Sequence, residues 1–430
     1  MATTRPVIAG GPDPAILALP FFEPRHADLA VRITDWWIAN QDLWPCLAGA
    51  DAGAAASGAD RSAGRGRQLL LRLGAAGLLA FLDPDSGRAE DGDLRSLCIA
   101  REALAYADDL ADFAFSIQAL ASTPILRYGT PEQRRRYLPA LAAGRCQAAF
   151  AISEPDAGSD VAAIATTADR VGDGYAIQGT KSWIASGGTA DVYCVIARTG
   201  EGPGALGLTA FLVPADTPGL TVEPVAMTAP RALAHLHFDG AKVGVQARLG
   251  RPGGGFPLAM EVLERFRMTV GAAALGFARR AADAAITHAR RRRIYDGRLF
   301  DLPTARATLA EVEVKLNAAA LLVARAAWEA DRGNGRYAKH SSIAKLHATE
   351  VAQEIVDACV QLHGAAGVVA GSVPERLYRQ IRSLRIYEGA SEIQRAIIAG
   401  SLDVRRAEHN HDLFEQRPDA VARSEHAEPV

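Results

Sequence analysis

Two carboxylates, Glu388 and Glu392, lie four residues apart in the stretch RIYEGASEIQ near the C-terminal end of the chain. On a helix this spacing puts both acids on one face, which is commonplace on a surface. The setting of Glu388 is less ordinary, because Ile386 and Tyr387 supply apolar bulk and Gly389 permits close backbone approach. Burial beside apolar groups raises the pKa of a carboxyl group toward neutrality, which a general base needs. Glu388 is therefore the candidate base for a proton abstraction.

Four other motifs have both an ordinary and a functional interpretation. AISEPDAGSD, residues 151–160, has the composition of a surface loop and lacks the acid spacing of a calcium loop. Trp183, in TKSWIAS, is of a type that more often fills a core than supports a cofactor. GRPGGGF, residues 250–256, lacks phosphate-loop spacing and indicates a hinge. Arg290–Arg293 is either a solvated helix end or a phosphate clamp.

Composition limits the classes of function. The chain has 430 residues, 49% of them apolar and 22% charged, with a formal net charge of −2, so neither nucleic acid nor an anionic membrane is an obvious partner. Its five cysteines are scattered without a CxxC pair, which argues against a disulfide framework or a zinc site and favours a reducing cytoplasm. No signal peptide and no apolar stretch of membrane-spanning length is expected.

The elements that would position these motifs fall into three blocks. Apolar residues three and four apart predict a helical domain over residues 26–146. Short β-rich runs separated by Gly, Pro and Asp predict a β domain over residues 147–250. Long helical patterns return over residues 251–407 and predict a helical bundle. Residues 1–25 and 408–430 are expected to be flexible tails.

Together these pieces resemble one family, the acyl-CoA dehydrogenases, over residues 27–404. The specific matches are AFAISEPDAGSD followed by TKSWIASGG, and the long segment QLHGAAGVVAGSVPERLYRQIRSLRIYEGASEIQ. The resemblance implies an α+β protein with an N-terminal helical domain, a middle domain like a β-barrel or β-sandwich, and a C-terminal four-helix bundle.

The resemblance gives Glu388 a chemical role. It implies that Glu388 removes the α-proton of an acyl thioester while the β-hydrogen leaves as hydride to N5 of FAD, giving a 2-enoyl thioester. The backbone N–H of Glu388 and a ribityl hydroxyl would then meet the enolate oxygen. The same resemblance implies substrate contacts at Ser159, Arg267, Tyr387 and Gly389.

The resemblance also implies a cofactor site shared between subunits. Arg292, Tyr295, Gln361 and Gly364 match positions that hold the adenosine end of FAD bound to a neighbouring subunit, which predicts a homotetramer or homodimer. The full set implied for FAD is Phe150, Ile152, Ser153, Ser159, Trp183, Ala185, Ser186, Arg292, Tyr295, Gln361, Gly364 and Glu392.

Several positions depart from the family pattern. Ala185 stands where the family usually has a Thr or Ser that bonds flavin N5, a change expected to alter flavin potential or oxygen reactivity, and Ser186 is the neighbouring hydroxyl. Ala390 removes a second hydroxyl. Some members carry the base just before the Arg that matches Arg267, but Phe266 fills that slot here and Glu264 is a poor substitute.

The loop MTAPRALAHLHFDG is shorter than usual and DPDSGRAEDG replaces a glycine-rich stretch, so the thioester carrier is either CoA or an acyl carrier protein. The electron acceptor is either an electron-transfer flavoprotein or oxygen. The competing functions are an oxidase or monooxygenase on the same fold, and a catalytically silent assembly protein without flavin.

Overall fold

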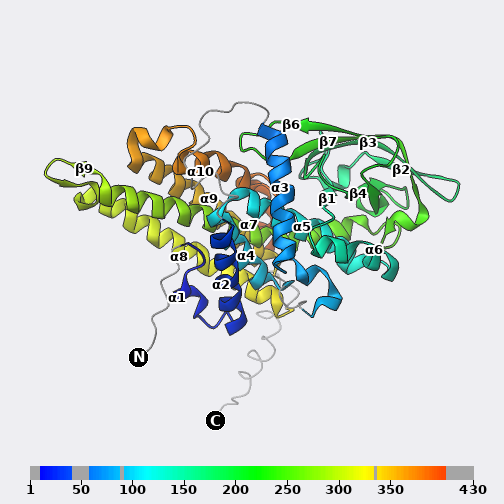
Figure 1. The fold of residues 1–430 in the computed structure, drawn as a ribbon. Coiled ribbons are helices and arrows are strands. Elements are labelled where there is room, and N and C mark those ends of the chain that lie inside the picture. The colour runs from blue at the N-terminus through cyan, green and yellow to red at the C-terminus, as the bar shows by residue number, and fades with distance from the viewer. Residues whose placement is uncertain (1–9, 41–57, 88–91, 334–336, 403–430) are drawn as a thin grey trace, which may run out of the picture.

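A computed structural model of the chain describes residues 10–40, 58–87, 92–333 and 337–402. Its helices surround one edge of a β domain and extend away from it as a long bundle (Figure 1). The α-helices are α1 (Pro14–Leu17), α2 (Pro24–Ala39), α3 (Gly58–Ala75), α4 (Leu94–Ala107), α5 (Asp109–Tyr128), α6 (Pro131–Ala142), α7 (Gly255–Arg291), α8 (Pro303–Asp331), α9 (Ala338–His363) and α10 (Val373–Ile381).

The N-terminal helices begin at residues that satisfy their free backbone N–H groups. Asp93 caps α4, Asp108 caps α5, and Thr130 with Gln133 forms a capping box on α6. Almost every residue of α4 is buried, because α2, α5, α7 and α8 pack around it. This helix is therefore the centre of the helical part of the molecule.

The middle of the chain forms a mixed eight-stranded sheet. Its strands run in the order β6-β7-β3-β2-β4-β5-β8, with β1 paired in parallel to β4. The strands are β1 (Ala148–Ala151), β2 (Thr167–Val171), β3 (Gly174–Ala185), β4 (Val192–Arg198), β5 (Leu208–Pro214), β6 (Leu220–Val225), β7 (Leu233–Gly244) and β8 (Arg248–Leu249). A separate cluster of buried side chains, including Tyr193, Phe211 and Phe238, holds this domain together.

The glycine-rich stretch at residues 250–256 joins the sheet to α7. A Cβ on Gly255 would lie 2.8 Å from backbone atoms of Thr209, so only glycine lets the start of α7 pass this close to β5. The helix then runs for 37 residues against α4, α8 and α9. Two short strands, β9 (Arg293–Ile294) and β10 (Gly297–Arg298), form a hairpin beyond its end, far from the sheet (Figure 1).

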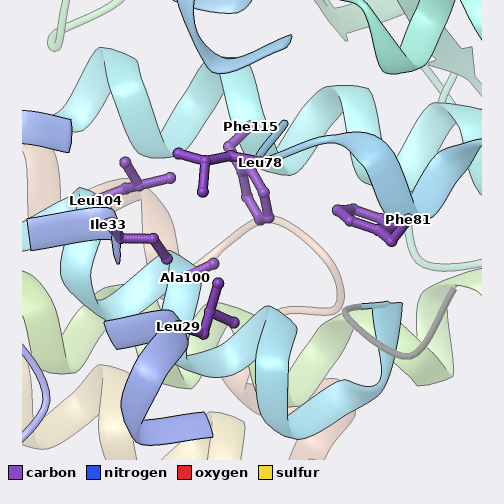
Figure 2. Close-up of a pocket in the computed structure, with 7 residues that line it drawn as sticks. All are labelled: Leu29, Ile33, Leu78, Phe81, Ala100, Leu104 and Phe115. Carbon is purple, nitrogen blue, oxygen red and sulfur yellow. The ribbon is translucent and has the colours of Figure 1, made fainter. Parts of the chain in front are cut away.

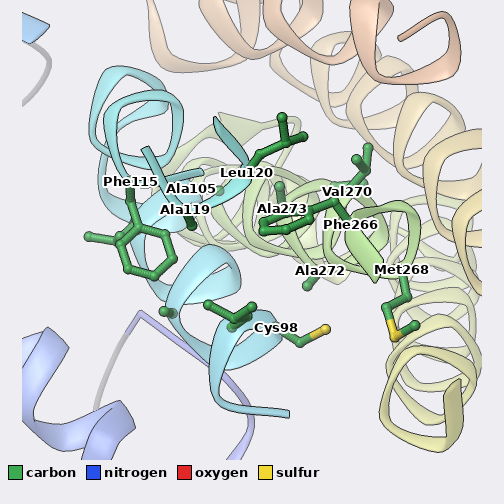
Figure 3. Close-up of a cluster of buried hydrophobic side chains, with 14 of the residues drawn as sticks. Cys98, Ala105, Phe115, Ala119, Leu120, Phe266, Met268, Val270, Ala272 and Ala273 are labelled. Atoms are coloured by element: carbon green, nitrogen blue, oxygen red, sulfur yellow. The ribbon is translucent and has the colours of Figure 1, made fainter. Parts of the chain in front are cut away.

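The main core lies between α4, α5 and α7, where small and large side chains interlock (Figure 3). A cavity of about 10 Å³ within this core is lined by residues with apolar side chains (Figure 2): Leu29, Ile33, Leu78, Phe81, Ala100, Leu104 and Phe115. That volume is close to the space of one water molecule. The cavity is a packing gap, with no room for a flavin or a thioester.

Residues 10–25 differ from the expected loose tail. Asp13 caps α1, and Ile16, Leu17 and Phe22 pack against the main core. The Phe21 ring meets Trp328 of α8 edge-on with 5.9 Å between ring centroids. The proline-rich sequence concealed this segment because its apolar residues follow no helical period. Residues 1–9 and 403–430, where the other flexible segments were expected, lie outside the described residues.

Within the described ranges, no helix is long and apolar enough to span a membrane, and no cluster of His, Cys, Asp and Glu could hold a metal ion.

Candidate active site

Backbone strain marks the residues singled out from the sequence. Within the described ranges, the non-glycine residues with positive φ are Trp183 (56°), Ser186 (61°), Tyr295 (51°) and Glu388 (53°). Left-handed backbone costs energy for such side chains and persists where the surrounding structure enforces it, commonly at functional sites. All four residues belong to the set implied by the sequence resemblance.

Glu388 lies between the 3-10 turn at Arg382–Arg385 and a helical segment over residues 391–402. The residue is only partly covered, yet its Oε2 atom is buried and has no hydrogen-bond partner. Burial raises the pKa of this carboxyl group, with Arg101 and Lys345 opposing the shift. An enclosed carboxylate with a free oxygen can accept a proton from a bound molecule.

A buried ionic cluster lies beside the candidate base. Arg101 of α4 donates to both oxygens of Asp112 on α5, at 2.9 and 3.0 Å, and to Thr269 Oγ1 of α7 at 3.0 Å. Arg101 is 2% exposed and Asp112 3%. Because both charges are fully paired, the cluster ties three helices together and places a cation near Glu388 without an unpaired buried charge.

A second buried arginine, Arg231, comes from the connection between β6 and β7. Its Nε lies 3.7 Å from Asp109 Oδ2, too far for a hydrogen bond, and neither atom has another partner within the described ranges. Arg231 and Arg101 counteract the rise that burial causes in the pKa of Tyr387. The hydroxyl of Tyr387, a residue assigned to the substrate from the sequence, is therefore buried among charged side chains.

Two buried donors hold the backbone after Glu388. Lys345 Nζ of α9 and Gln394 Nε2 donate to the Gly389 carbonyl at 2.9 and 2.8 Å. Gly389 has a φ of 91°, and a Cβ there would lie 2.5 Å from Gln394 Nε2. Glycine at this position is therefore required by the turn itself, in addition to any substrate that approaches. Arg267 Nε lies nearby and is buried without a partner.

Trp183 lies at an irregularity in β3, where pairing to β7 shifts between Lys181 and Ile184. Its side chain is 48% exposed and meets His235 edge-on with 5.8 Å between ring centroids. A large exposed ring on a strained backbone is available to a planar ligand. Ala185, next but one, is partly buried and has no hydroxyl to offer.

Ser186 does not replace the missing hydroxyl in this structure. Its side chain is fully buried, its Oγ accepts a hydrogen bond from Gln147 Nε2 at 3.0 Å, and its backbone N–H donates to Ala232 at 2.8 Å. Ser186 thus fixes the end of β3 from inside the protein.

The AISEPDAGSD loop has a buried ionic anchor that sequence reasoning missed. Glu154 bonds Lys181 Nζ at 2.7 Å and accepts from the N–H groups of Ala165 and Thr166 at 2.7 and 3.0 Å. Lys181 also donates to the Ile152 carbonyl at 3.1 Å. The only available signal was that lysine is rare in this chain.

This anchor holds the loop residues assigned to the flavin. Phe150 is buried at 9% exposure in β1, Ile152 and Ser153 are partly buried, and Ser159 is exposed. The Ser153 carbonyl accepts from the Ser182 N–H at 2.8 Å, which joins the loop to β3 one residue before Trp183. The Ser182 hydroxyl is buried without a partner.

The residues assigned to the adenosine end of FAD lie elsewhere. Arg292 ends α7, Tyr295 lies at the turn of the β9–β10 hairpin with 86% of its surface exposed, and Gln361 and Gly364 are exposed at the end of α9. The rings of His288 and His363, 4.5 Å apart between centroids, bring the two helix ends together. These residues form one exposed surface at the end of the bundle, while Glu392 is exposed near the Glu388 turn.

The alternative base position is closed. Phe266 is 1% exposed and packs in the main core (Figure 3). Glu264 is partly buried and its pKa is raised by burial, but a spacing of two residues puts it on roughly the opposite side of α7 from position 266.

Three domain profiles of one family together match most of the chain. The N-terminal, middle and C-terminal domain profiles of acyl-CoA dehydrogenases match residues 51–145, 149–241 and 253–402. The chain belongs to the acyl-CoA dehydrogenase family. The α+β fold follows, as does the activity class, an FAD-dependent oxidoreductase that acts on the CH–CH bond of an acyl thioester.

Three similar proteins illustrate the range of the family. The short-chain specific acyl-CoA dehydrogenase of Bos taurus mitochondria is 36% identical over 335 residues, covering 77% of this chain and 81% of the relative. A glutaryl-CoA dehydrogenase of Mycobacterium smegmatis solved with FADH2 is 27% identical with a TM-score of 0.77, covering 89% of this chain and 95% of the other. The prolyl acyl carrier protein oxidase AnaB is 26% identical with a TM-score of 0.77, covering 89% and 99%.

The residues near β3 fit a flavin. Trp183 leaves a large ring face uncovered, and the buried Ser182 hydroxyl lacks a partner on the loop that precedes it. The Glu154–Lys181 pair fixes that loop without using the exposed side chains. Apolar ring surface with few fixed polar groups is the usual lining of a cofactor site.

Proposed function

We propose that this chain dehydrogenates an acyl thioester at the α,β position with Glu388 as the base. The supporting observation is the buried, unpartnered Oε2 of Glu388 on a left-handed backbone that two buried donors hold in place. A carboxylate in such a place is dry, fixed and basic enough to take a weakly acidic proton.

The chain's own residues divide the work. Glu388 takes the α-proton at Oε2, and Arg101 and Lys345 oppose the rise that burial causes in the pKa of this carboxyl group. The Glu388 N–H has no acceptor within the described ranges, so it can donate to the thioester oxygen as negative charge develops there. Phe150, Ser153 and Trp183 would hold FAD, which when bound supplies the acceptor for the β-hydrogen.

Replacing the base tests this assignment. Glu388→Gln keeps the shape of the side chain but cannot accept the proton, so we expect FAD content to be unchanged and anaerobic flavin bleaching by the thioester to slow by at least about 10³-fold. The matched control is Glu132→Gln, which removes an exposed acid at the start of α6 and should retain bleaching. Bleaching at the native rate by Glu388→Gln would show that another group is the base.

The thioester carrier is proposed to be either CoA or an acyl carrier protein. The connection before β7 contributes Arg231 to the charged groups around Tyr387, one of the residues assigned to the substrate. The likeness to an acyl carrier protein oxidase supports the second carrier. Offering one acyl group on each carrier to the anaerobic enzyme and comparing bleaching rates decides between them.

Oxygen is the second candidate acceptor, beside an electron-transfer flavoprotein. Ala185 carries no hydroxyl, and the Ser186 side chain is fully buried inside the protein, so neither residue offers the flavin a hydroxyl donor. Peroxide formed in a 1:1 ratio with enoyl product, at the rate of turnover and without a partner protein, would establish an oxidase.

We further propose a cytoplasmic homo-oligomer, either tetramer or dimer. Val314 and Leu321, seven residues apart on one face of α8, are 69% and 40% exposed, and Tyr295, Val368 and Val369 are exposed at the end of the bundle. Apolar side chains gathered on a bundle face are typical of association surfaces. The free thiols of Cys98, Cys194 and Cys359 fit a reducing compartment.

A further inference from the structure

Lys345 has an unusual position for a lysine. Its side chain is fully buried in α9, and its Nζ makes one hydrogen bond, to the Gly389 carbonyl at 2.9 Å. No carboxylate within the described ranges forms an ion pair with it. A buried ammonium without a paired anion is costly, so its location next to the candidate base calls for a physical reason.

Lys181 provides the contrast within the same chain. It is also fully buried, but Glu154 neutralises it at 2.7 Å and further N–H groups satisfy that carboxylate. Lys181 therefore has a complete structural role. Lys345 instead has a neutral carbonyl as its partner and Glu388 as the anion with the greatest influence on it.

The carbonyl that Lys345 holds controls the placement of Glu388. Glu388 has a φ of 53°, which is strained for a residue other than glycine and persists only where surrounding groups enforce it. Gln394 Nε2 donates to the same carbonyl at 2.8 Å, and Gln394 is fully buried. A charged donor and a neutral donor thus converge on one oxygen directly after the base.

We propose that Lys345 is a positioning residue for Glu388: its ammonium group fixes the turn through the Gly389 carbonyl, and its charge favours the ionised carboxylate. This inference rests on the proposed function of Glu388. Gln394 also donates to the Gly389 carbonyl but carries no charge. Both residues therefore fix the turn, and only Lys345 favours the ionised form of Glu388.

Other charges act on the pair from several helices. Arg101 of α4, Arg267 of α7 and Asp112 of α5 also face Glu388. Arg101 is bound to Asp112 on both of its oxygens, which leaves Lys345 and Arg267 as the cations whose charge is not paired by a short contact.

Glu350 of α9, Glu392 and Arg267 act on Lys345 besides Glu388. Glu350 is bound to Arg385 at 2.6 Å and accepts from Ser391, so its charge is largely compensated. Glu392 is exposed and is partly paired with Arg395. Glu388 is thus the anion near Lys345 whose charge is not compensated by another partner. Burial, and to a smaller extent Arg267, lowers the pKa of Lys345 to about 8, while the carboxylates oppose that shift.

The test is the pH profile of substrate-dependent flavin bleaching in FAD-loaded variants. A unit charge about 6 to 12 Å away, at an effective dielectric constant near 20, shifts the pKa of a carboxyl group by about one to two pH units. Lys345→Gln should therefore move the acidic limb of kcat/KM upward by about that amount and slow bleaching at least about tenfold. Lys345→Arg keeps charge and donor, so its acidic limb should stay within a few tenths of the native one.

Two controls separate charge from structure. Gln394→Met removes the neutral donor and should slow bleaching without moving the acidic limb. Lys315→Gln removes an exposed lysine that is paired with Glu354 and should change neither quantity. An acidic limb that stays in place in folded, FAD-loaded Lys345→Gln overturns the proposal.

A measurement on Glu388→Gln keeps the proposal testable if Lys345→Gln does not fold. The chain has only five lysines, so ¹³C-lysine NMR can follow each ammonium group through its titration. Coupling between two sites is reciprocal, so Glu388→Gln should shift the Lys345 titration to lower pH and leave Lys181 in place. No shift at Lys345 overturns the inference while leaving Glu388 as the base, whereas full turnover by Glu388→Gln overturns the proposed function instead.

Discussion

At the scale of single residues, the buried charged side chains around the candidate site are of two kinds: some form close ion pairs and some do not. Glu154 with Lys181 and Arg101 with Asp112 form close ion pairs. Glu388 and Lys345 form no close ion pair within the described ranges, and Arg231 and Asp109 are too far apart for a hydrogen bond. Arg231 and Glu388 both lie near Tyr387. Such groups make the native state depend on pH, because their pKa values differ between folded and unfolded chains.

Asp109 gives a stability prediction from this difference. Burial, with Asp108 beside it, raises the pKa of Asp109 from 3.8 to about 6, with Arg231 opposing the shift. The folded chain resists ionising this acid, so stability present below about pH 4 is lost as the pH rises through 6. Asp109→Asn should then raise stability above pH 6 by on the order of 1–3 kcal/mol and have little effect near pH 4.

Thermal unfolding midpoints at pH 4.5 and 7.5, with FAD present, measure this effect. Asp35→Asn, an exposed acid on α2, is the matched control and should change stability equally little at both values. A destabilising Asp109→Asn at pH 7.5 would show that attraction to Arg231 outweighs burial of the carboxylate.

At the scale of elements, the site depends on three helices that meet at one arginine. Arg101 of α4 reaches Asp112 of α5 and Thr269 of α7, so displacement of any of these helices breaks the same cluster. The helices bury apolar faces against each other around it. The ionic pair therefore specifies how α4 and α5 fit together more than it adds to their attraction.

Removing only Arg101 should lower the free energy of unfolding far more than removing both Arg101 and Asp112. Arg101→Met leaves Asp112 charged and buried, so we expect a loss of about 3–5 kcal/mol, whereas Arg101→Met with Asp112→Leu should recover most of it. Urea unfolding midpoints of the two variants at equal FAD concentration provide the comparison. A double variant no more stable than Arg101→Met would mean that the pair supplies net stability.

The sequence was a good guide to elements and a poorer guide to the turns between them. Helical periodicity and the glycine-rich joint predicted long helices flanking a β domain, and the family profiles confirm the fold class. An extended TKSWIAS segment was expected, but Trp183 and Ser186 adopt left-handed backbone there. Periodicity reports which faces are buried, while such irregularities depend on tertiary partners such as Gln147 and Ala232.

The buried partners of the site were likewise hidden from the sequence. Glu154 and Lys181 are 27 residues apart, and Lys345 and Gly389 are 44 apart. Their pairing follows from the packing of the β3 strand and of α9, which no local pattern encodes. Glu388 could be proposed from the sequence because its neighbours in the chain, Tyr387 and Gly389, carry the local signal.

At the scale of the whole molecule, the candidate cofactor residues divide into two surfaces. Trp183 and the loop before β3 lie at the sheet, whereas Arg292, Tyr295, Gln361 and Gly364 lie at the far end of the bundle, beyond the 37 residues of α7 (Figure 1). A helix of that length spans roughly 55 Å, more than one FAD can bridge. If both surfaces serve the cofactor, they must come from different subunits, so FAD binding and assembly become a single equilibrium.

Arg292→Ala tests this linkage. The residue is exposed at the C-terminal end of α7, where its removal leaves no buried group unsatisfied, so the monomer fold should be retained. Losing a charged donor to the cofactor costs about 1.5–3 kcal/mol, which predicts FAD retention weakened by roughly 10- to 150-fold. Because the same side chain would contact a neighbouring subunit, the oligomer should dissociate at a higher protein concentration and be restored by added FAD.

Arg291→Ala is the matched control, since it removes an adjacent exposed arginine at the same helix end and should leave both quantities unchanged. Sedimentation velocity over a range of concentrations, followed at a flavin wavelength and at 280 nm, reads assembly and FAD content in one experiment. Loss of FAD without a change in assembly would place Arg292 against the cofactor of its own subunit. Dissociation that added FAD does not reverse would instead make Arg292 a subunit contact alone, because linkage requires that FAD bind the assembled form more tightly than the separated subunits.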